Sequence, residues 1–285
     1  MALTHLQVGP YRVIGRSLGG FYTSLLVPEL KSLFDVGAAF RAGSTARNLF
    51  LSHGHADHIG ALPALLGMRG LMGVKTPIRI FAPAKVVAKL PAFLSSFSEL
   101  HHWPMHVDLV PLEVGDVVKV QNDLWVKAIQ TFHPVPSLGY LISRRVQKLK
   151  QEFRSLPGAE IKRLKADQEQ RLFDTVDKPE FAYVTDTLPE VLTHHPELYD
   201  VRVLVLECTF LDERKSVKHA RAGCHIHLEE LRPHLSRFKN EAVLLMHFSQ
   251  LYHPTEVRRI LQENLETRDS ERFHLMLPAS GSWWE

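Results

Sequence analysis

Apolar residues in the first half of the chain fall in short runs separated by turn residues, a pattern that predicts strands. Phe21–Val27 and Leu49–Leu51 are rich in apolar or β-branched residues, and Leu33–Val36 ends at Gly37, a plausible turn. Further strands are predicted at Ile78–Ala82, Val107–Leu112, Val117–Val120, Leu124–Ile129 and Leu138–Ser143. Near-helical spacing of apolar residues predicts helices from Asp57 to about Met72, which Pro63 should bend or begin, and at Ala84–Phe97.

In the second half, strand-like runs alternate with helical ones. Strands are predicted at Phe181–Thr185, Val201–Leu206 and Ala242–Met246, and helices at Pro189–His194, Asp212–His219, His227–Phe238 and Thr255–Leu265. Two β-rich halves, each followed by helices, indicate two sheets packed face to face with helices outside. We therefore expect an α/β fold in which residues 1–285 form a single domain.

The composition is that of an ordinary globular protein. Of the 285 residues, 45% are hydrophobic and 23% charged, and two cysteines exclude a disulfide framework. The first residues, MALTHLQVGPYRVIG, lack the basic start and apolar run of a secretory signal. No apolar stretch reaches the roughly 18 residues that a membrane span requires. These features predict a cytoplasmic protein with no membrane partner.

Positive charge is concentrated in one segment, residues 144–171. The whole chain carries a net charge of +3. The segment holds nine basic and four acidic residues, a net charge of +5, so the remainder carries −2. A solvated helical face, with Glu160 and Arg163 as a local pair, is the ordinary interpretation of such a run. A surface that contacts phosphates is the alternative.

The most informative string is LSHGHADHIG at Leu51–Gly60, which follows an apolar strand. In an extended segment His53 and His55 point to the same side, and a helix beginning after them turns Asp57 and His58 toward neighbouring directions. Imidazole and carboxylate are the ligands that zinc takes in proteins. The spacing therefore predicts that this one loop supplies ligands to two adjacent metal ions. The alternative is a solvated loop that is rich in histidine by chance.

His-x-His-x-Asp-His after a strand resembles the signature of the metallo-β-lactamase superfamily. That resemblance implies an αββα sandwich, with two packed mixed sheets flanked by helices, and three later ligands that each follow a strand. His133, Asp186 and His247 stand at such places. Taken alone, they would be read as a loop histidine, a helix-capping residue and a polar strand end.

The resemblance also implies how these residues divide between two metal ions. The first ion would be held by His53, His55, His133 and Asp186, and the second by Asp57, His58, Asp186 and His247. Asp186 would bridge them. Two Zn²⁺ ions per chain are implied, with Mn²⁺ as an alternative.

Two later motifs resemble those of ribonuclease Z, the tRNA 3′-processing endonuclease, in its short form. Glu207-Cys-Thr-Phe follows the apolar run RVLVL, and Cys224-His225-Ile-His227 lies downstream. The resemblance implies that His225 protonates the leaving ribose oxygen, that Glu207 orients its ring, and that Asp57 orients the attacking water. His227 is an alternative acid. A carboxylate paired with a nearby cation, and a helix-terminal histidine without a role, are the other interpretations of Glu207 and His225.

The function implied is cleavage of the 3′ trailer from precursor tRNA by metal-hydroxide attack on a phosphodiester, by a homodimeric hydrolase. The apolar stretch after Asp57 is predicted to be core, and the resemblance to homodimeric family members gives a dimer face as the alternative for part of it. The basic segment 144–171 lies where this family inserts its tRNA-contacting arm, and it resembles the compact arm of plant-type members. Candidate phosphate contacts are Lys148, Lys150, Lys162, Arg163 and Lys165. A phosphodiesterase or other small-ester hydrolase, and a non-catalytic metal- or RNA-binding protein, are the alternatives.

Overall fold

The first half of the chain forms one mixed β-sheet. The computed structural model describes residues 3–265 and 271–284, except for the side chains of residues 165–170. Within these residues the first sheet has seven strands, in the order β1 (Thr4–Val8), β2 (Tyr11–Leu18), β3 (Tyr22–Val27), β4 (Ser32–Phe34), β5 (Asn48–Phe50), β6 (Ile78–Pro83) and β7 (Val107–Leu112). Neighbours from β1 to β4 are antiparallel, and neighbours from β4 to β7 are parallel.

The second half forms a second sheet with the same plan. Its seven described strands run in the order β14 (Phe273–Leu275), β13 (Ala242–Met246), β12 (Val203–Glu207), β11 (Phe173–Val184), β10 (Leu138–Leu149), β9 (Leu124–Gln130) and β8 (Val117–Gln121). Strands β8 to β11 are antiparallel neighbours, and β11 to β14 are parallel. Each sheet therefore consists of four antiparallel strands in sequence order, followed by strands that pair in parallel.

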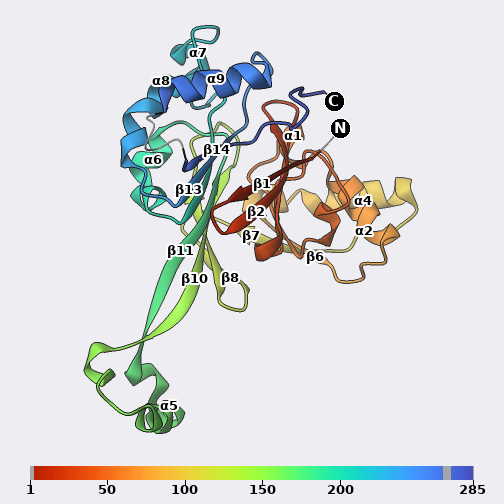
Figure 1. Cartoon of the computed structure of the whole chain (residues 1–285). Helices are drawn as coiled ribbons and strands as arrows, with labels where there is room; N and C mark the ends of the chain where they lie inside the picture. Colours follow the sequence, from red (N-terminus) through yellow and green to blue (C-terminus); the bar gives the residue numbers. More distant parts are fainter. Residues whose placement is uncertain (1–2, 266–270, 285) are drawn as a thin grey trace.

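Helices cover the outer face of each sheet (Figure 1). The first sheet carries α1 (Ala56–Ile59), α2 (Leu62–Leu71), α3 (Ala84–Val87) and α4 (Leu90–His101), and the second carries α6 (Glu190–His194), α7 (Val217–Ala222), α8 (Leu228–Leu231) and α9 (Pro254–Asn264). The predicted sandwich of two mixed sheets flanked by helices is thus confirmed. In the described ranges, no helix combines the length and the apolar character needed to cross a bilayer.

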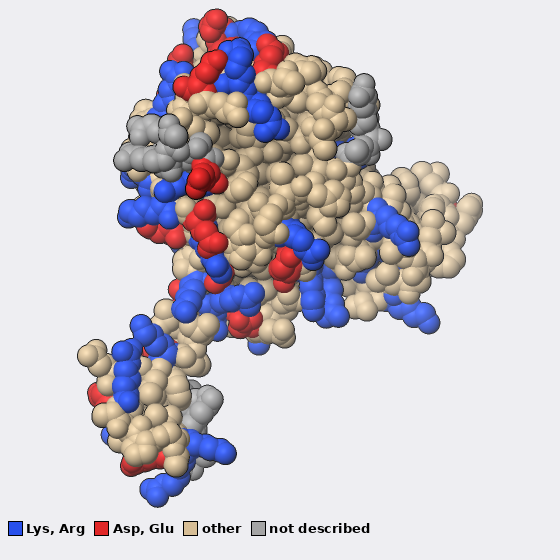
Figure 2. All heavy atoms as spheres, viewed as in Figure 1, with Lys and Arg blue, Asp and Glu red and all other residues tan. Residues whose placement is uncertain are grey.

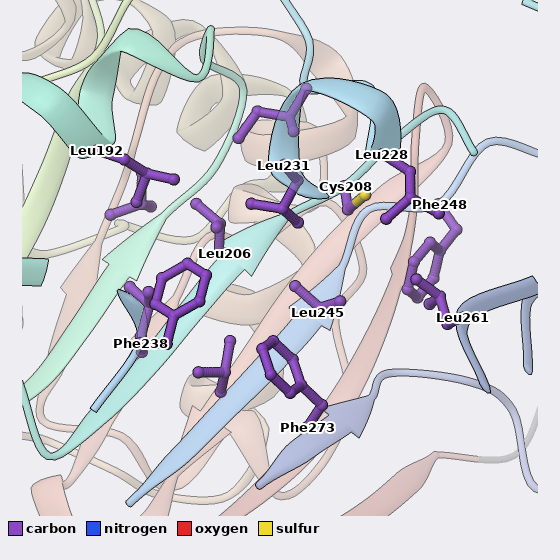
Figure 3. Close-up of a cluster of buried hydrophobic side chains, with 14 of the residues drawn as sticks. Leu192, Leu206, Cys208, Leu228, Leu231, Phe238, Leu245, Phe248, Leu261 and Phe273 are labelled. Carbon is purple, nitrogen blue, oxygen red and sulfur yellow. The ribbon is translucent and has the colours of Figure 1, made fainter. Parts of the chain in front are cut away.

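Three apolar layers hold the sandwich together. The central layer lies between the sheets, where Phe34 stacks on Phe50 of the first sheet and on Phe181 of the second, with ring centroids 5.2 and 5.1 Å apart. One outer layer packs α2 and α4 on the first sheet. The other packs α6, α8 and α9 on the second, and Figure 3 shows its leucine and phenylalanine side chains spread over the sheet, with Cys208 beside Leu228 and Leu231. Burial of this apolar surface is the main force that fixes the strand ends in place.

Several predicted helices are interrupted where their sequence disfavours a helix. The predicted helix after Asp57 is divided into α1 and α2, with Pro63 in the first turn of α2 as expected. The predicted helix at Ala84–Phe97 is divided into α3 and α4, and Pro91 lies in the first turn of α4. The prediction of one helix over His227–Phe238 was wrong: Pro233 begins a 3-10 helix directly after α8. The helix predicted at Asp212–His219 is shifted to α7.

The basic segment is part of an arm that projects from the body (Figure 1). The prediction that a strand ends at Ser143 was wrong, because β10 continues to Leu149 and pairs with β11 from Phe173 onward. This antiparallel ribbon carries a 3-10 helix at Gln151–Phe153 and helix α5 (Gly158–Leu172) at its tip. At the root of the arm, the Arg145 guanidinium lies 3.9 Å from the Trp125 ring centroid and forms two hydrogen bonds to Asp177.

Candidate metal centre

The candidate site lies along the edge where the parallel strands of both sheets end. Asp35 follows β4 and His53 follows β5 in the first sheet, while Asp186 follows β11 and His247 follows β13 in the second. Parallel strands bring their carboxyl ends to one edge of a sheet, which is where such folds gather polar side chains. Because the sheets face each other, the two edges meet and their polar residues converge.

One cluster forms around His53, His55, His133 and Asp186, whose candidate ligand atoms all lie within 4.8 Å of one another. The Nε2 atom of His53 is 3.0 Å from Nδ1 of His55 and 3.6 Å from Oδ2 of Asp186. The Nε2 atom of His133 is 3.3 Å from the same His55 nitrogen. The structure therefore brings all four predicted ligands of the first ion together.

The second cluster forms around Asp57, His58 and His247. The Nε2 atoms of His58 and His247 are 3.3 Å apart, and Oδ2 of Asp57 lies 3.4 and 3.6 Å from them. Oδ1 of Asp186 lies 3.4 Å from His58 Nε2 and 3.3 Å from His247 Nε2. The two oxygens of Asp186 thus face different clusters, which is the arrangement a bridging carboxylate needs.

The donor set fits a pair of divalent cations. Ligands around a tetrahedral zinc ion, with bonds of about 2.0–2.1 Å, lie roughly 3.4 Å from one another, close to the separations in both clusters. The outward nitrogens of three histidines are already engaged: Nδ1 of His53 by Ser52 Oγ at 2.9 Å, of His58 by Asp35 at 2.8 Å, and of His247 by Thr209 Oγ1 at 3.0 Å. Such outer contacts fix the tautomer and aim the other nitrogen at a metal.

Electrostatics favour a cation at this place. Burial works to raise the pKa of Asp57, but hydrogen bonds from His247 and His58 lower it well below its usual range. Burial likewise opposes ionisation of Asp186, and the charges of His247 and His58 again outweigh it and lower the pKa. Burial lowers the pKa of His53 far below its ordinary value, so this imidazole is neutral at physiological pH. Ionised carboxylates and a neutral imidazole are the forms that bind metals.

His225 and Glu207 lie beside the clusters. Oε1 of Glu207, which is fully buried, is 3.1 Å from Nδ1 of His225 and also accepts a bond from the Thr187 backbone at 2.8 Å. The His225 ring stacks against His247 at 5.4 Å. Burial would lower the pKa of His225, but the Glu207 carboxylate raises it to about 9. The contacts hold an imidazole with one nitrogen turned toward the metal clusters.

His227, the alternative acid, is engaged at both ring nitrogens. Its Nε2 contacts the Asp212 carbonyl at 3.1 Å, and its Nδ1 accepts the Glu229 N–H at 3.1 Å as the N-cap of α8. A histidine that caps a helix from a buried position has a structural role, so the geometry favours His225 as the acid.

Backbone strain occurs at the ends of β11 and β13, the two strands that flank β12 in the second sheet. Asp186 and His247 adopt φ values of 39° and 62°, a region that residues with a side chain seldom occupy. Gly19 lies against His247, where an added Cβ would be 3.0 Å from its carbonyl oxygen, and the Gly20 N–H donates to Asp57 Oδ2 at 2.9 Å. Strain of this kind persists where the surrounding structure enforces it, as at binding sites.

Sequence reasoning missed Asp35, the residue that connects the second cluster to both sheets. Its carboxylate is fully buried and accepts bonds from the Ser52 backbone at 2.7 Å, the Ser52 hydroxyl at 2.8 Å, and the Tyr183 hydroxyl of the second sheet at 2.7 Å. With His58, this makes four partners. An acidic residue inside the apolar run LFDV was the available signal.

Replacing Asp35 by asparagine is expected to weaken metal binding about 10- to 100-fold, the usual effect of losing an outer-shell partner. An asparagine side chain cannot accept hydrogen bonds from all four donors, because its NH₂ group, which only donates, replaces one of the two carboxylate oxygens. Metal affinity measured by titration checks this. Asp123→Asn, which changes an exposed carboxylate on Arg144, is the matched control and should bind as the unaltered protein does. Equal affinities in both variants would contradict the assigned role.

Lys and Arg side chains lie on the surface of the projecting arm (Figure 2). Arg144 pairs with Asp123, Arg145 with Asp177, and Lys150 lies 4.0 Å from Asp174. Of the predicted phosphate contacts, Lys148, Lys162 and Arg163 are exposed and have no ion-pair partner among the described residues. The local Glu160–Arg163 pair is absent from the ion pairs in that part of the chain. The side chain of Lys165 lies outside the described residues.

Comparisons with known proteins agree with this geometry. A family model for the beta-lactamase superfamily domain matches residues 38–248. The chain is 36% identical over 254 residues to tRNase Z TRZ1 of Arabidopsis thaliana, covering 88% of this chain and 90% of that protein. It is 34% identical to the same plant's chloroplastic tRNase Z TRZ2, covering 89% and 72%. The crystal structure of the short form of human tRNase Z matches with a TM-score of 0.57 at 20% identity, covering 88% and 94%.

Proposed function

This chain belongs to the tRNase Z family of the beta-lactamase superfamily, and from that membership we propose that it is a metal-dependent endoribonuclease that removes the 3′ trailer from precursor tRNA. The observation that carries the proposal is the convergence of seven ligand residues, from both sheets, beside the Glu207–His225 pair. Both plant relatives carry tRNase Z as their name, and the match covers most of each chain.

The residues that would hold the metal are His53, His55, His133 and Asp186 for one ion, and Asp57, His58, Asp186 and His247 for the other. Zinc fits the imidazole-rich set, and manganese is the alternative. Two such ions would activate the attacking water and neutralise negative charge on the reacting phosphate. The structure supports two places for ions because Asp186 presents a separate oxygen to each cluster.

The chain's own residues supply positioning and proton transfer. Asp57 is held by the Gly20 N–H and would orient the attacking water through its carboxylate. Glu207 fixes the His225 ring through Nδ1, so that the other nitrogen can donate a proton to the ribose 3′ oxygen as the P–O bond breaks. The products would be a tRNA with a 3′-hydroxyl and a trailer with a 5′-phosphate.

The direct test incubates the purified chain with a 3′-extended tRNA and zinc or manganese. Cleavage at one position that leaves a 3′-hydroxyl is expected. A protein that loads metal yet leaves the precursor uncut while hydrolysing bis(p-nitrophenyl) phosphate would favour the small-ester hydrolase instead. A protein that loads metal and turns over neither substrate would favour a non-catalytic binding role.

His225→Ala is expected to slow cleavage of precursor tRNA at least about 100-fold, because general acids contribute factors of this size. Hydrolysis of bis(p-nitrophenyl) phosphate should change little, since p-nitrophenolate leaves without being protonated. His227→Asn retains an N-cap side chain for α8 and is the matched control, with tRNA cleavage near the original rate. Equal losses on both substrates in His225→Ala would point to damaged metal binding rather than a missing acid.

We propose further that the arm grips the body of the tRNA, and that two copies of the chain form a homodimer. The dimer face would lie on α2 and just beyond the end of α4, where Leu71, Met72 and Trp103 are exposed and Trp103 lines a groove of about 350 Å³. Sedimentation of the purified chain tests this.

The cytoplasmic location stays a prediction; two relatives are named as chloroplastic and nuclear proteins.

A further inference from the structure

The turn between β2 and β3 carries an exposed aromatic ring to the rim of the metal centre. Gly19 donates its N–H to the Phe248 carbonyl, next to His247, and Gly20 donates to Asp57. The next residue, Phe21, is therefore one peptide unit from a group that contacts a candidate ligand. Its side chain is 43% exposed, although the two glycines that precede it are bonded to residues of the site.

A second exposed ring meets Phe21 from the far end of the described chain. Trp284 is 51% exposed, and its ring lies 5.0 Å from that of Phe21 at an interplanar angle of 76°. The adjacent Trp283 anchors it: its ring N–H donates to the Tyr252 carbonyl at 2.7 Å, and its carbonyl accepts the Tyr22 hydroxyl at 2.9 Å. Figure 1 shows this end of the chain beside α1, the helix that bears Asp57 and His58.

Trp283 and Trp284 thus differ in how deeply the fold buries them. Trp283 is 7% exposed and packs in the outer core of the second sheet, while Trp284 and Phe21 leave much of their apolar surface in water. An edge-to-face pair leaves a ring face open for a further planar group. At the rim of a phosphodiester site, the planar group available is a nucleobase of the substrate, and only an unpaired base can leave its own stack to reach a protein ring.

We propose that Phe21 and Trp284 form a stacking platform for an unpaired nucleobase adjacent to the scissile phosphate. The proposal rests on the proposed function, because it requires an RNA substrate in the metal centre. Stacking on aromatic side chains is tolerant of base identity. The platform would therefore position the RNA strand at the point of cleavage whatever the identity of the base. Phe21 and Trp284 would instead select for an unpaired nucleotide at this point.

The test compares an ordinary 3′-extended tRNA with versions that carry an abasic nucleotide on one or the other side of the scissile phosphate. In the unaltered protein, one abasic substitution should reduce kcat/KM about tenfold or more, the usual scale for a stacked base. In Trp284→Ala and Phe21→Leu, the intact tRNA should be cut about as poorly as the abasic one, and base removal should have no further effect. Trp284→Phe should retain most of the dependence on the base.

Two controls separate this role from a structural one. Phe93→Ala removes a ring of similar exposure, 44%, on α4, and should keep the full abasic penalty. The metal content of Trp284→Ala should equal that of the unaltered protein, because neither ring is a candidate metal ligand, and the variant should still hydrolyse the ester bis(p-nitrophenyl) phosphate. An abasic penalty that persists undiminished in Trp284→Ala, or that is missing from the unaltered protein, would overturn the proposal. An unaltered protein that hydrolyses the ester but cuts no tRNA would instead remove the proposed function, and the platform with it.

Discussion

Asp186→Ala is expected to reduce cleavage of 3′-extended tRNA at least about a thousandfold, the largest effect of any single change in the chain. Its carboxylate lies within 3.3–3.6 Å of ring nitrogens of His53, His58 and His247. Without it, both clusters would lose a candidate ligand and the negative charge that would balance the two proposed cations. Removing other ligands affects one cluster, whereas this change affects both.

Metal content and activity together check this expectation. The variant should retain less than the full complement of metal by elemental analysis, and excess zinc should not restore the rate. Because Asp186 is buried and its backbone is strained, circular dichroism must show that the variant is folded. Asp57→Ala offers a second route, since its side chain is less buried and serves one cluster. If both folded variants retained the original rate, the metal assignment would be wrong.

The second large effect concerns the arm. Reversing the charge of Lys148, Lys162 and Arg163 to glutamate is expected to raise KM for precursor tRNA at least about tenfold, because phosphate contacts dominate nucleic-acid affinity. The dependence of binding on salt should weaken, with the slope against salt falling by roughly one for each lost contact. Hydrolysis of bis(p-nitrophenyl) phosphate should be unchanged, since the arm projects away from the metal centre (Figure 1).

A control variant with the same change in net charge tests whether general electrostatic attraction, rather than the arm, accounts for the loss of tRNA affinity. Changing Lys89, Arg232 and Arg258, which are exposed on the body, to glutamate alters the net charge equally. If that variant loses as much tRNA affinity as the arm variant, general electrostatic attraction is responsible and the arm has no special role.

Part of the candidate ligand set could be predicted from a local pattern, and the rest only from a family resemblance. His53, His55, Asp57 and His58 fall at metal-ligand spacing in one loop, whereas His133, Asp186 and His247 were predicted because they stand where the metallo-β-lactamase superfamily has its later ligands. Strands with a continuous apolar run, such as β12 and β13, were predicted, whereas β1 and β2, in which polar residues interrupt the apolar ones, were not. The parallel halves of the sheets then bring the residues that follow these strands to one edge.

Asp35 and the arm could not be predicted in the same way. A single carboxylate has no spacing pattern, and its importance arises from partners 17, 23 and 148 positions away. The outer parts of β10 and β11 have no core beneath them, so their residues are polar or only partly buried on both faces. Apolar periodicity therefore gives no signal there, and the ribbon is fixed by pairing between its strands and by Arg145 at its root.

The division of the chain between the sheets has a consequence for how the protein is made. All strands of one sheet precede Val117, and all strands of the other follow Leu112. A ribosome therefore synthesises every described strand of the first sheet, with four of the seven candidate ligand residues, before it synthesises the other three. A nascent chain at that stage has no bridging carboxylate. If the chain were cut in the short connection between these residues, the two fragments would have to reassociate through the central aromatic layer before either side-chain cluster could form.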